Sequence, residues 1–324
     1  MSAHSNRSAL EAPRPPLRRL LHQWGFVPPL AVPAAVVSLR TRDGVRLVAD
    51  HLPGPPTGPI GTIGVVVAHG FGAHRRKPAY GLLSEQLAAA ASVLALDLRG
   101  HGQSQGACTL GDLEALDLVA AAAWLRRRGC RFVVGIGVSM GGTALLHAAG
   151  SGPQRGHGTH ARQERPAPRA GFDAVCTISS PAMWGREHTP ALRVISWMAT
   201  GRAGRLSARA LRVRMADRWG RRHPPEALAP VDLIGRIAPV PVLLVHGLDD
   251  HFFAISHAEA LASAGGPATV LWREPAGFGH AEDGLRPAFL ARLVAAVQHV
   301  AASGSWPEAP AWGASDSVPG SATD

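Results

Sequence analysis

A glycine-flanked serine at a predicted strand-to-helix corner constrains this chain most strongly. Residues 133–138 form an apolar run typical of a buried strand, Gly137 to Gly141 spell Gly-x-Ser-x-Gly around Ser139, and residues 143–149 have a helical pattern. A serine at such a corner is held in a strained backbone with its hydroxyl exposed. Gly137 and Gly141 have no side chains, which allows strand and helix to pass close to each other. The chain holds 37 glycines, so the flanking strand and helix, more than the five-residue pattern, make this corner informative.

Short apolar runs alternate with helical patterns along most of the sequence. The Asp43-Gly44 pair between two such runs predicts a hairpin. The predicted strands cover residues 36–42, 46–51, 63–68, 92–97, 132–138, 174–179, 242–246 and 269–273, and the predicted helices cover 80–91, 113–127, 143–149, 256–263 and 286–301. This alternation predicts an α/β protein with a doubly wound, mostly parallel sheet covered by helices on both faces.

Several segments interrupt this pattern and suggest a domain organisation. Pro-, Gly- and Arg-rich or polar composition predicts a flexible arm over residues 1–35, a flexible insertion over 151–170 and a disordered tail over 303–324. The core then comprises residues 36–180 and 237–302. Residues 181–236, with helical patterns at 192–198 and 206–219, predict a small helical cap inserted before the strand that carries the acid. Eleven arginines and four acidic residues give this cap a charge of +7.

Composition limits the classes of partner and cofactor. The net charge of +10 is almost entirely arginine, with Lys77 the single lysine, and aromatic residues make up only 5%, so we expect no nucleic-acid partner. No apolar run reaches the roughly 18 residues of a membrane span, so we expect no stable membrane anchor. Cys108, Cys130 and Cys176 form neither a disulfide framework nor a metal-ligand pattern, and they fit a reducing cytoplasm as small buried side chains. The sequence predicts no metal, nucleotide or flavin site and no other cofactor.

A serine hydroxyl needs a neighbouring base, and the base needs an orienting acid. Reactive groups in a doubly wound sheet gather at the carboxyl ends of its strands. His280 lies in a glycine-rich loop after the last predicted strand, and it is the predicted base. Asp249 and Asp250 follow the preceding strand. The Gly-x-x-Asp spacing favours Asp250 as the acid, with Asp249 as a turn or cap residue, and both alternatives stay open.

The same reasoning predicts an oxyanion hole made of backbone N–H groups. The N–H of Met140, directly after the predicted nucleophile, would be one donor. The other is expected from the loop His69-Gly70-Phe71-Gly72, with the N–H of Phe71 as the donor. Gly70 lets this backbone approach a substrate, and His69 is expected to support the loop.

Five motifs, in this order along the chain, resemble those of the α/β-hydrolase superfamily. They are His69-Gly-Phe-Gly72, Asp97-Leu-Arg-Gly-His-Gly-Gln-Ser104, Gly137-Val-Ser-Met-Gly141, His246-Gly-Leu-Asp-Asp250 and Gly277-Phe-Gly-His280. The resemblance covers about residues 36–301, apart from 151–170. Within the superfamily the chain looks like bacterial serine esterases and monoacylglycerol-lipase-like hydrolases. It departs from several of these in having Val138 after Gly137 and Phe at position 71, and Ser139 stands where haloalkane dehalogenases have Asp.

These motifs predict a serine hydrolase that cleaves a small-molecule carboxylic ester through an acyl-enzyme, with Ser139, Asp250 and His280 as its triad. Apolar residues of the cap suggest an apolar acyl group: Trp184, Ile195, Trp197 and Met198. The cap arginines could attract an anionic ester or thioester, or simply form a solvated face. The alternatives are a thioesterase, amidase, perhydrolase or acyltransferase with the same triad, and a non-catalytic binding protein.

Overall fold

An eight-stranded sheet organises the part of the chain that the structure describes. The computed structural model describes residues 30–55, 63–151, 171–184, 189–216 and 229–309. The strand order is β1-β2-β4-β3-β5-β6-β7-β8. Strand β2 is antiparallel to both of its neighbours, β1 and β4, and all other neighbouring strands pair in parallel. The bounds are β1 (Ala35–Arg40), β2 (Arg46–Leu52), β3 (Ile63–Ala68), β4 (Ser92–Asp97), β5 (Phe132–Val138), β6 (Ala174–Ile178), β7 (Val242–Gly247) and β8 (Thr269–Glu274). The predicted doubly wound, mostly parallel α/β architecture is confirmed.

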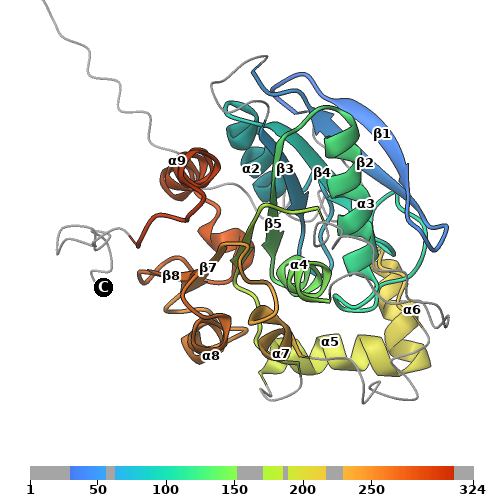
Figure 1. Ribbon diagram of the computed structural model, residues 1–324. Coiled ribbons are helices and arrows are strands. Elements are labelled where there is room, and N and C mark those ends of the chain that lie inside the picture. The colour runs from blue at the N-terminus through green and yellow to red at the C-terminus, as the bar shows by residue number, and fades with distance from the viewer. Residues whose placement is uncertain (1–29, 56–62, 152–170, 185–188, 217–228, 310–324) are drawn as a thin grey trace, which may run out of the picture.

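Helices cover both faces of this sheet (Figure 1). One face carries α2 (Pro78–Ala88) and α9 (Pro287–Ser303), and the other carries α3 (Glu114–Arg127), α4 (Met140–Gly150), α7 (Pro230–Ile234) and α8 (Ile255–Gly265). Successive residues of a strand point to opposite faces. Accordingly Val65 and Val67 join the core under α2 and α9, whereas Val66 and Ala68 join the core on the other face.

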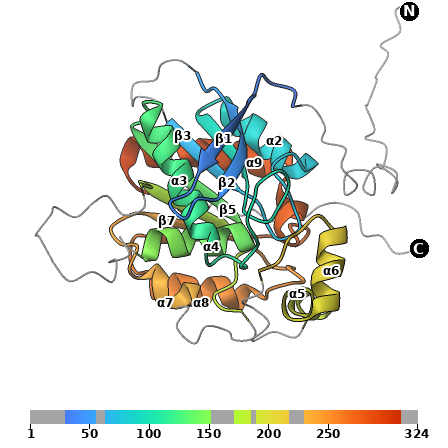
Figure 2. The ribbon, with the colours of Figure 1, turned by 90° about the vertical axis from the view of Figure 1, so that its right-hand side faces the viewer.

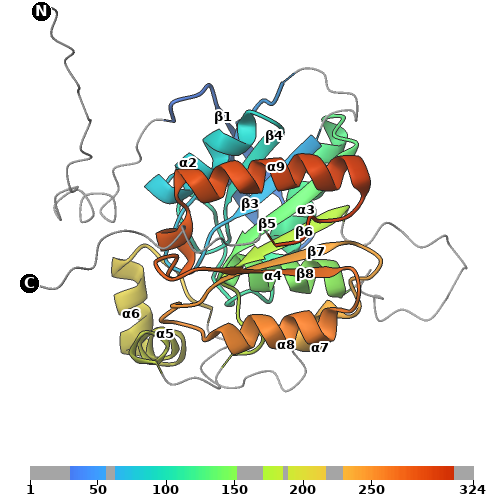
Figure 3. The ribbon, with the colours of Figure 1, turned by 90° about the vertical axis from the view of Figure 1, so that its left-hand side faces the viewer.

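The segment predicted as a cap, between β6 and β7, ends with α7 on the face of the sheet and has two further helices among its described residues. They are α5 (Pro190–Thr200) and α6 (Arg202–Ala210), which pack against each other, as Figures 2 and 3 show. Gly204 makes their contact close, because a Cβ at this position would lie 2.0 Å from the carbonyl oxygen of Trp197. Met198, Ala199 and Ala208 are buried in the same core as α4.

The predicted helix over residues 206–219 is wrong at its start, and it is not continuous through the described residues. Helix α6 begins at Arg202 and ends at Ala210, and Arg212 then adopts a left-handed φ of +60°. The following backbone turns instead to the loop after β4, where the N–H of Cys108 donates to the carbonyl of Arg214 at 2.6 Å. Tertiary hydrogen bonds therefore override the local helical pattern, and residues 217–219 lie outside the described part.

The flanking segments are only partly described. Most of the arm over 1–35, nearly all of the insertion over 151–170 and residues 310–324 of the tail lie outside the described residues. Leu30 and Val32 pack against the core, and so does Trp306, which is 4% exposed and donates from Nε1 to the carbonyl of Pro241. The first residues of the predicted tail therefore belong to the packed structure. The three cysteines are free and buried, as predicted. The described helices include none long and apolar enough to cross a membrane.

Candidate active site

Ser139 occupies a strained corner between β5 and α4. Its φ of +51° is left-handed, a conformation that a non-glycine residue keeps only where its surroundings hold it. Its N–H donates to the carbonyl of Ile178 at 2.7 Å. Two neighbours must be glycine: a Cβ on Gly137 would lie 2.4 Å from the carbonyl oxygen of Gly141, and one on Gly141 would lie 2.5 Å from that of Ala68. The close passage expected from the sequence is therefore present, and Ser139 remains 8% exposed.

The loops after β7 and β8 bring an imidazole and a carboxylate to this serine. His280 Nε2 lies 3.2 Å from Ser139 Oγ, and His280 Nδ1 lies 2.7 and 2.9 Å from the two oxygens of Asp250. The Asp250 side chain is fully buried. Burial opposes its charge, but hydrogen bonds from His280 and from the N–H groups of Phe253 and Phe252 outweigh burial, so the pKa of Asp250 lies below its usual value. An ionised Asp250 fixes the Nδ1–H tautomer of His280 and leaves Nε2 free to accept a proton.

The hydrogen-bonded chain of Ser139, His280 and Asp250 is called the relay below. Asp249 lies beside it and makes different contacts. Its carboxylate accepts hydrogen bonds from the N–H groups of Gly277 at 2.7 Å and Gly279 at 3.0 Å. These two backbone bonds lower the pKa of Asp249. Of the two candidate acids, Asp250 contacts the imidazole of His280, and Asp249 fastens the glycine-rich loop that carries this histidine.

Near Ser139, the backbone N–H groups of Phe71 and Met140 make no hydrogen bond within the described residues. Around Phe71, the N–H of Gly70 donates to Tyr80 Oη at 2.9 Å, that of Gly72 to His101 Nε2 at 3.3 Å, and that of Ala73 to the carbonyl of Gly70 at 3.2 Å. Met140 is the first residue of α4, whose N–H has no intrahelical partner. Both N–H groups predicted as oxyanion donors are therefore available to a substrate.

Comparisons with known proteins agree with this fold. A model of the α/β-hydrolase fold family matches residues 64–205. The chain therefore has the α/β-hydrolase fold. A search of curated proteins finds no match.

Among solved structures, this α/β hydrolase is similar to an esterase from Pyrococcus furiosus, with 19% identity, a TM-score of 0.60, and coverage of 86% of this chain and 93% of the other. It is also similar to an esterase from Rhodococcus sp., with 18% identity, a TM-score of 0.54, and coverage of 83% and 98%. An α/β serine hydrolase without a lid from Xanthomonas campestris gives 17% identity, a TM-score of 0.52, and coverage of 87% and 100%. At these identities the likeness shows the fold.

Two buried histidines hold the loop of Phe71 in this hydrolase. His69 Nδ1 donates to the carbonyl of Gly70 at 2.7 Å, and its Nε2 accepts from the N–H of Leu98 at 3.1 Å. His101 Nε2 accepts from Gly72, and its Nδ1 donates to the carbonyl of Arg99 at 3.1 Å. Each ring therefore uses both nitrogens in the neutral form. Burial is the main cause that lowers the pKa of both histidines to about 3.

Acid is expected to unfold this protein partly through His69 and His101. In the unfolded chain a histidine binds a proton near pH 6.5, whereas each of these folded rings stays neutral down to about pH 3. Stability is therefore retained above pH 6.5 and falls as the pH is lowered, by about 2 kcal/mol per histidine between pH 7.5 and 5. Urea unfolding of wild type and His101→Gln at both pH values measures this difference. The variant should lose about 2 kcal/mol less than wild type on acidification, and an equal loss in both proteins contradicts the assignment.

Two serines after β6 support the site, although no sequence pattern marks them as functional. The hydroxyl of Ser180 donates to the carbonyl of Ser139 at 3.1 Å, and the hydroxyl of Ser179 accepts from the N–H of Ala281 at 2.9 Å. One serine braces the corner and the other braces the loop of His280. Phe252 was missed as well, and its ring stacks on the imidazole of His280 with centroids 4.3 Å apart. The available signals were that Ser179 and Ser180 follow β6, the strand next to β5, and that Phe252 lies two residues after Asp250.

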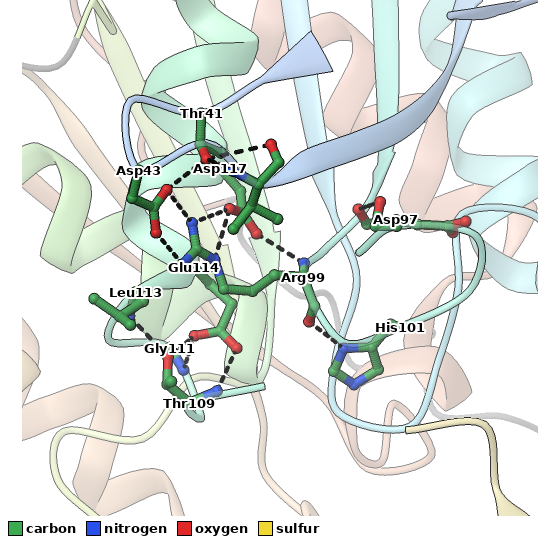
Figure 4. Close-up of polar contacts among 12 residues, drawn as sticks. Thr41, Asp43, Asp97, Arg99, His101, Thr109, Gly111, Leu113, Glu114 and Asp117 are labelled. Atoms are coloured by element: carbon green, nitrogen blue, oxygen red, sulfur yellow. Dashed lines mark hydrogen bonds and ion pairs between the residues drawn. The ribbon is translucent and has the colours of Figure 1, made fainter. Parts of the chain in front are cut away.

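A buried polar network fixes the loop that carries His101 (Figure 4). The N–H and Nε of Arg99 both donate to Asp117 at 2.8 Å, and its Nη1 donates to Asp43 at 2.8 Å. Burial opposes the charge of Arg99, but its hydrogen bonds to these carboxylates raise its pKa. Glu114 accepts from the N–H groups of Thr109 and Gly111. The acidic start of α3, which suits the helix dipole, thus also anchors the segment from Arg99 to Gly111.

The remaining candidate ligands do not form a metal centre in the described ranges, where no group of three or more His, Cys, Asp or Glu side chains could hold an ion. His246 Nε2 donates to the carbonyl of Phe253 at 2.8 Å, and His257 Nδ1 accepts from the N–H of Ala182 at 3.0 Å. Both histidines therefore bond to backbone, and His246 helps to shape the loop that holds Asp250.

Proposed function

We propose that this protein is a serine hydrolase that cleaves small-molecule carboxylic esters through an acyl-enzyme. The observation that supports it most is the hydrogen-bonded chain from Ser139 Oγ through His280 to the buried Asp250. A hydrolase is supported by the α/β-hydrolase fold. The ester as substrate is favoured by the solved structures from Pyrococcus furiosus and Rhodococcus, which are named esterases.

The proposed reaction has two stages. His280 Nε2 takes the proton of Ser139 as the serine oxygen attacks the ester carbonyl, and Asp250 stabilises the resulting imidazolium. The N–H groups of Phe71 and Met140 donate to the oxyanion, a contribution worth about 3–4 kcal/mol per donor in comparable enzymes. His280 then protonates the leaving alcohol. A water molecule, deprotonated by His280, attacks the acyl-enzyme and releases the acid and free Ser139.

Aromatic side chains near the relay favour an apolar acyl group. Phe71 lies next to the predicted oxyanion donor and packs with its ring 5.9 Å from that of His101, and Phe252 covers one face of His280. Both are half-buried, so they combine apolar surface with access from solvent. An acyl chain of intermediate length would remove this surface from water.

A fluorophosphonate probe and a substrate panel test the proposed function together. The probe should attach to Ser139, identified by peptide mass spectrometry, and the protein should hydrolyse p-nitrophenyl esters from acetate to decanoate. Matched thioesters and anilides distinguish the alternatives, and we expect esters to have a kcat/KM at least tenfold above both. A folded protein that neither reacts with the probe nor hydrolyses any ester would be a binding protein. A preference for thioesters or amides would reassign the substrate class.

A further inference from the structure

A cavity of about 480 Å³ lies beside α6, outside the relay of Ser139, His280 and Asp250. Three arginines of this helix line it: Arg202, Arg205 and Arg209. Its other walls are apolar and come from Leu206, Met215 and the alanines at positions 107 and 216. The cavity thus combines a cationic side with an apolar side.

The spacing of the three arginines places them on one face of the helix. Residues three and four apart are neighbours on a helix surface, and like charges at these spacings destabilise it. Helix α6 contains no acidic residue. Within the ranges that the structure describes, the guanidinium groups of Arg202 and Arg209 have no carboxylate partner. A bound anion would relieve this repulsion, and guanidinium groups suit carboxylate and phosphate because they donate several hydrogen bonds in one plane.

The part of the lining that lies outside α6 is fixed before any ligand binds. The backbone of residues 214–216 is held by three hydrogen bonds, from Cys108 N–H to the Arg214 carbonyl at 2.6 Å, from Arg214 N–H to the Gly100 carbonyl at 2.8 Å, and from Ala216 N–H to the Cys108 carbonyl at 2.9 Å. Nε of Arg214 also donates to the carbonyl of Gly106. A cavity with such a wall costs little conformational entropy on binding.

The apolar lining indicates that the ligand is more than a simple ion. Leu206 is 63% exposed although it lines the cavity, and an alkyl chain placed against it and Met215 would remove apolar surface from water. We propose that the cavity binds an anionic amphiphile, whose carboxylate or phosphate group contacts Arg202, Arg205 and Arg209 and whose alkyl chain packs on Leu206 and Met215.

This binding site is separate from the proposed ester hydrolysis, although its wall reaches the relay. Cys108, which bonds to the cavity wall, also contacts Met140 with its sulfur 3.6 Å from the methionine sulfur. Met140 follows Ser139 directly. Binding can be measured without turnover, so the two proposals succeed or fail independently.

Calorimetric titration with octyl phosphate and with octanoate at low salt tests the site. Octanol, which lacks the anionic group, and inorganic phosphate, which lacks the alkyl chain, serve as control ligands. The double variant Arg202→Gln/Arg209→Gln removes two charges from the cavity. Arg193→Gln, an exposed change on α5 outside the lining, is the matched control. Circular dichroism and urea midpoints show that the variants fold.

We expect an anionic octyl ligand to bind wild type and Arg193→Gln equally, and to bind the double variant at least about tenfold more weakly, because charged hydrogen bonds are lost. Octanol and inorganic phosphate should both bind more weakly than octyl phosphate. Comparison of octyl phosphate with octanoate identifies the preferred anion. Equal binding to the double variant, an equal loss in Arg193→Gln, or no binding of either anion would overturn the proposal.

Discussion

Ser139→Ala is expected to lower kcat on a p-nitrophenyl ester by about 10⁴- to 10⁶-fold, the range found when a triad nucleophile is removed from comparable hydrolases. The methyl group cannot form an acyl-enzyme, and it leaves His280 Nε2 without the hydroxyl that lies 3.2 Å away. Residual turnover would come only from the N–H groups of Phe71 and Met140 acting on attack by water. Steady-state kinetics and a burst measurement check the loss of the acyl-enzyme.

A matched control separates chemistry from folding. Ser303→Ala changes an exposed serine at the end of α9, whose hydroxyl bonds to the carbonyls of His299 and Ser305 and not to the catalytic residues. This control should keep wild-type kcat and fluorophosphonate labelling, whereas Ser139→Ala should lose both and keep its urea midpoint. If Ser139→Ala retained kcat within tenfold of wild type, another nucleophile would have to perform the reaction.

The predictable part of this fold rests on periodic patterns. The parallel strands are continuous apolar runs because both faces of the sheet are covered, and each predicted strand is present with bounds shifted by two residues at most. The bounds of α4 were less accurate. Its predicted start was residue 143, but it begins at Met140, since Gly141 and Gly142 lie in the helix despite their low propensity. Close packing requires them, as a Cβ on Gly142 would meet the hydroxyl of Ser180.

The candidate site likewise has a part that the sequence predicts and a part that it does not. Ser139, Asp250 and His280 follow strand ends, so topology predicts that they meet. The supporting contacts have no local pattern in the sequence. Ser179, Ser180 and Asp249 each bond to the backbone of a strand connection other than the one they belong to. The sequence favoured Asp250 over Asp249 by spacing, but the role of Asp249 depends on where the amides of the His280 loop lie in space. Such partners become visible only when the loops are placed together.

Asp250→Asn and Asp249→Asn should therefore differ by orders of magnitude in kcat. An asparagine at position 250 loses the carboxylate that stabilises the imidazolium and can favour the wrong tautomer of His280, which lowers kcat by about 10⁴-fold in comparable triads. At position 249 an asparagine keeps one acceptor for the N–H groups of Gly277 and Gly279 and loses the other. The loop of His280 is then held less firmly while the relay stays complete, and we expect a loss of about tenfold, close to the 1.4 kcal/mol of one hydrogen bond.

The pH dependence of kcat/KM distinguishes an acid that stabilises the imidazolium from one that only positions its loop. The basic form of His280 carries the reaction in wild type, and Asp249→Asn should keep the wild-type shape of the profile at a reduced height. Asp250→Asn should also change the shape of the profile. The rate that remains at neutral pH no longer depends on an imidazolium stabilised by a carboxylate, and attack by hydroxide raises this remaining rate at alkaline pH. The reverse pattern, with the larger loss and the altered profile in Asp249→Asn, would assign the acid to Asp249 and would require the loops after β7 and β8 to rearrange when substrate binds.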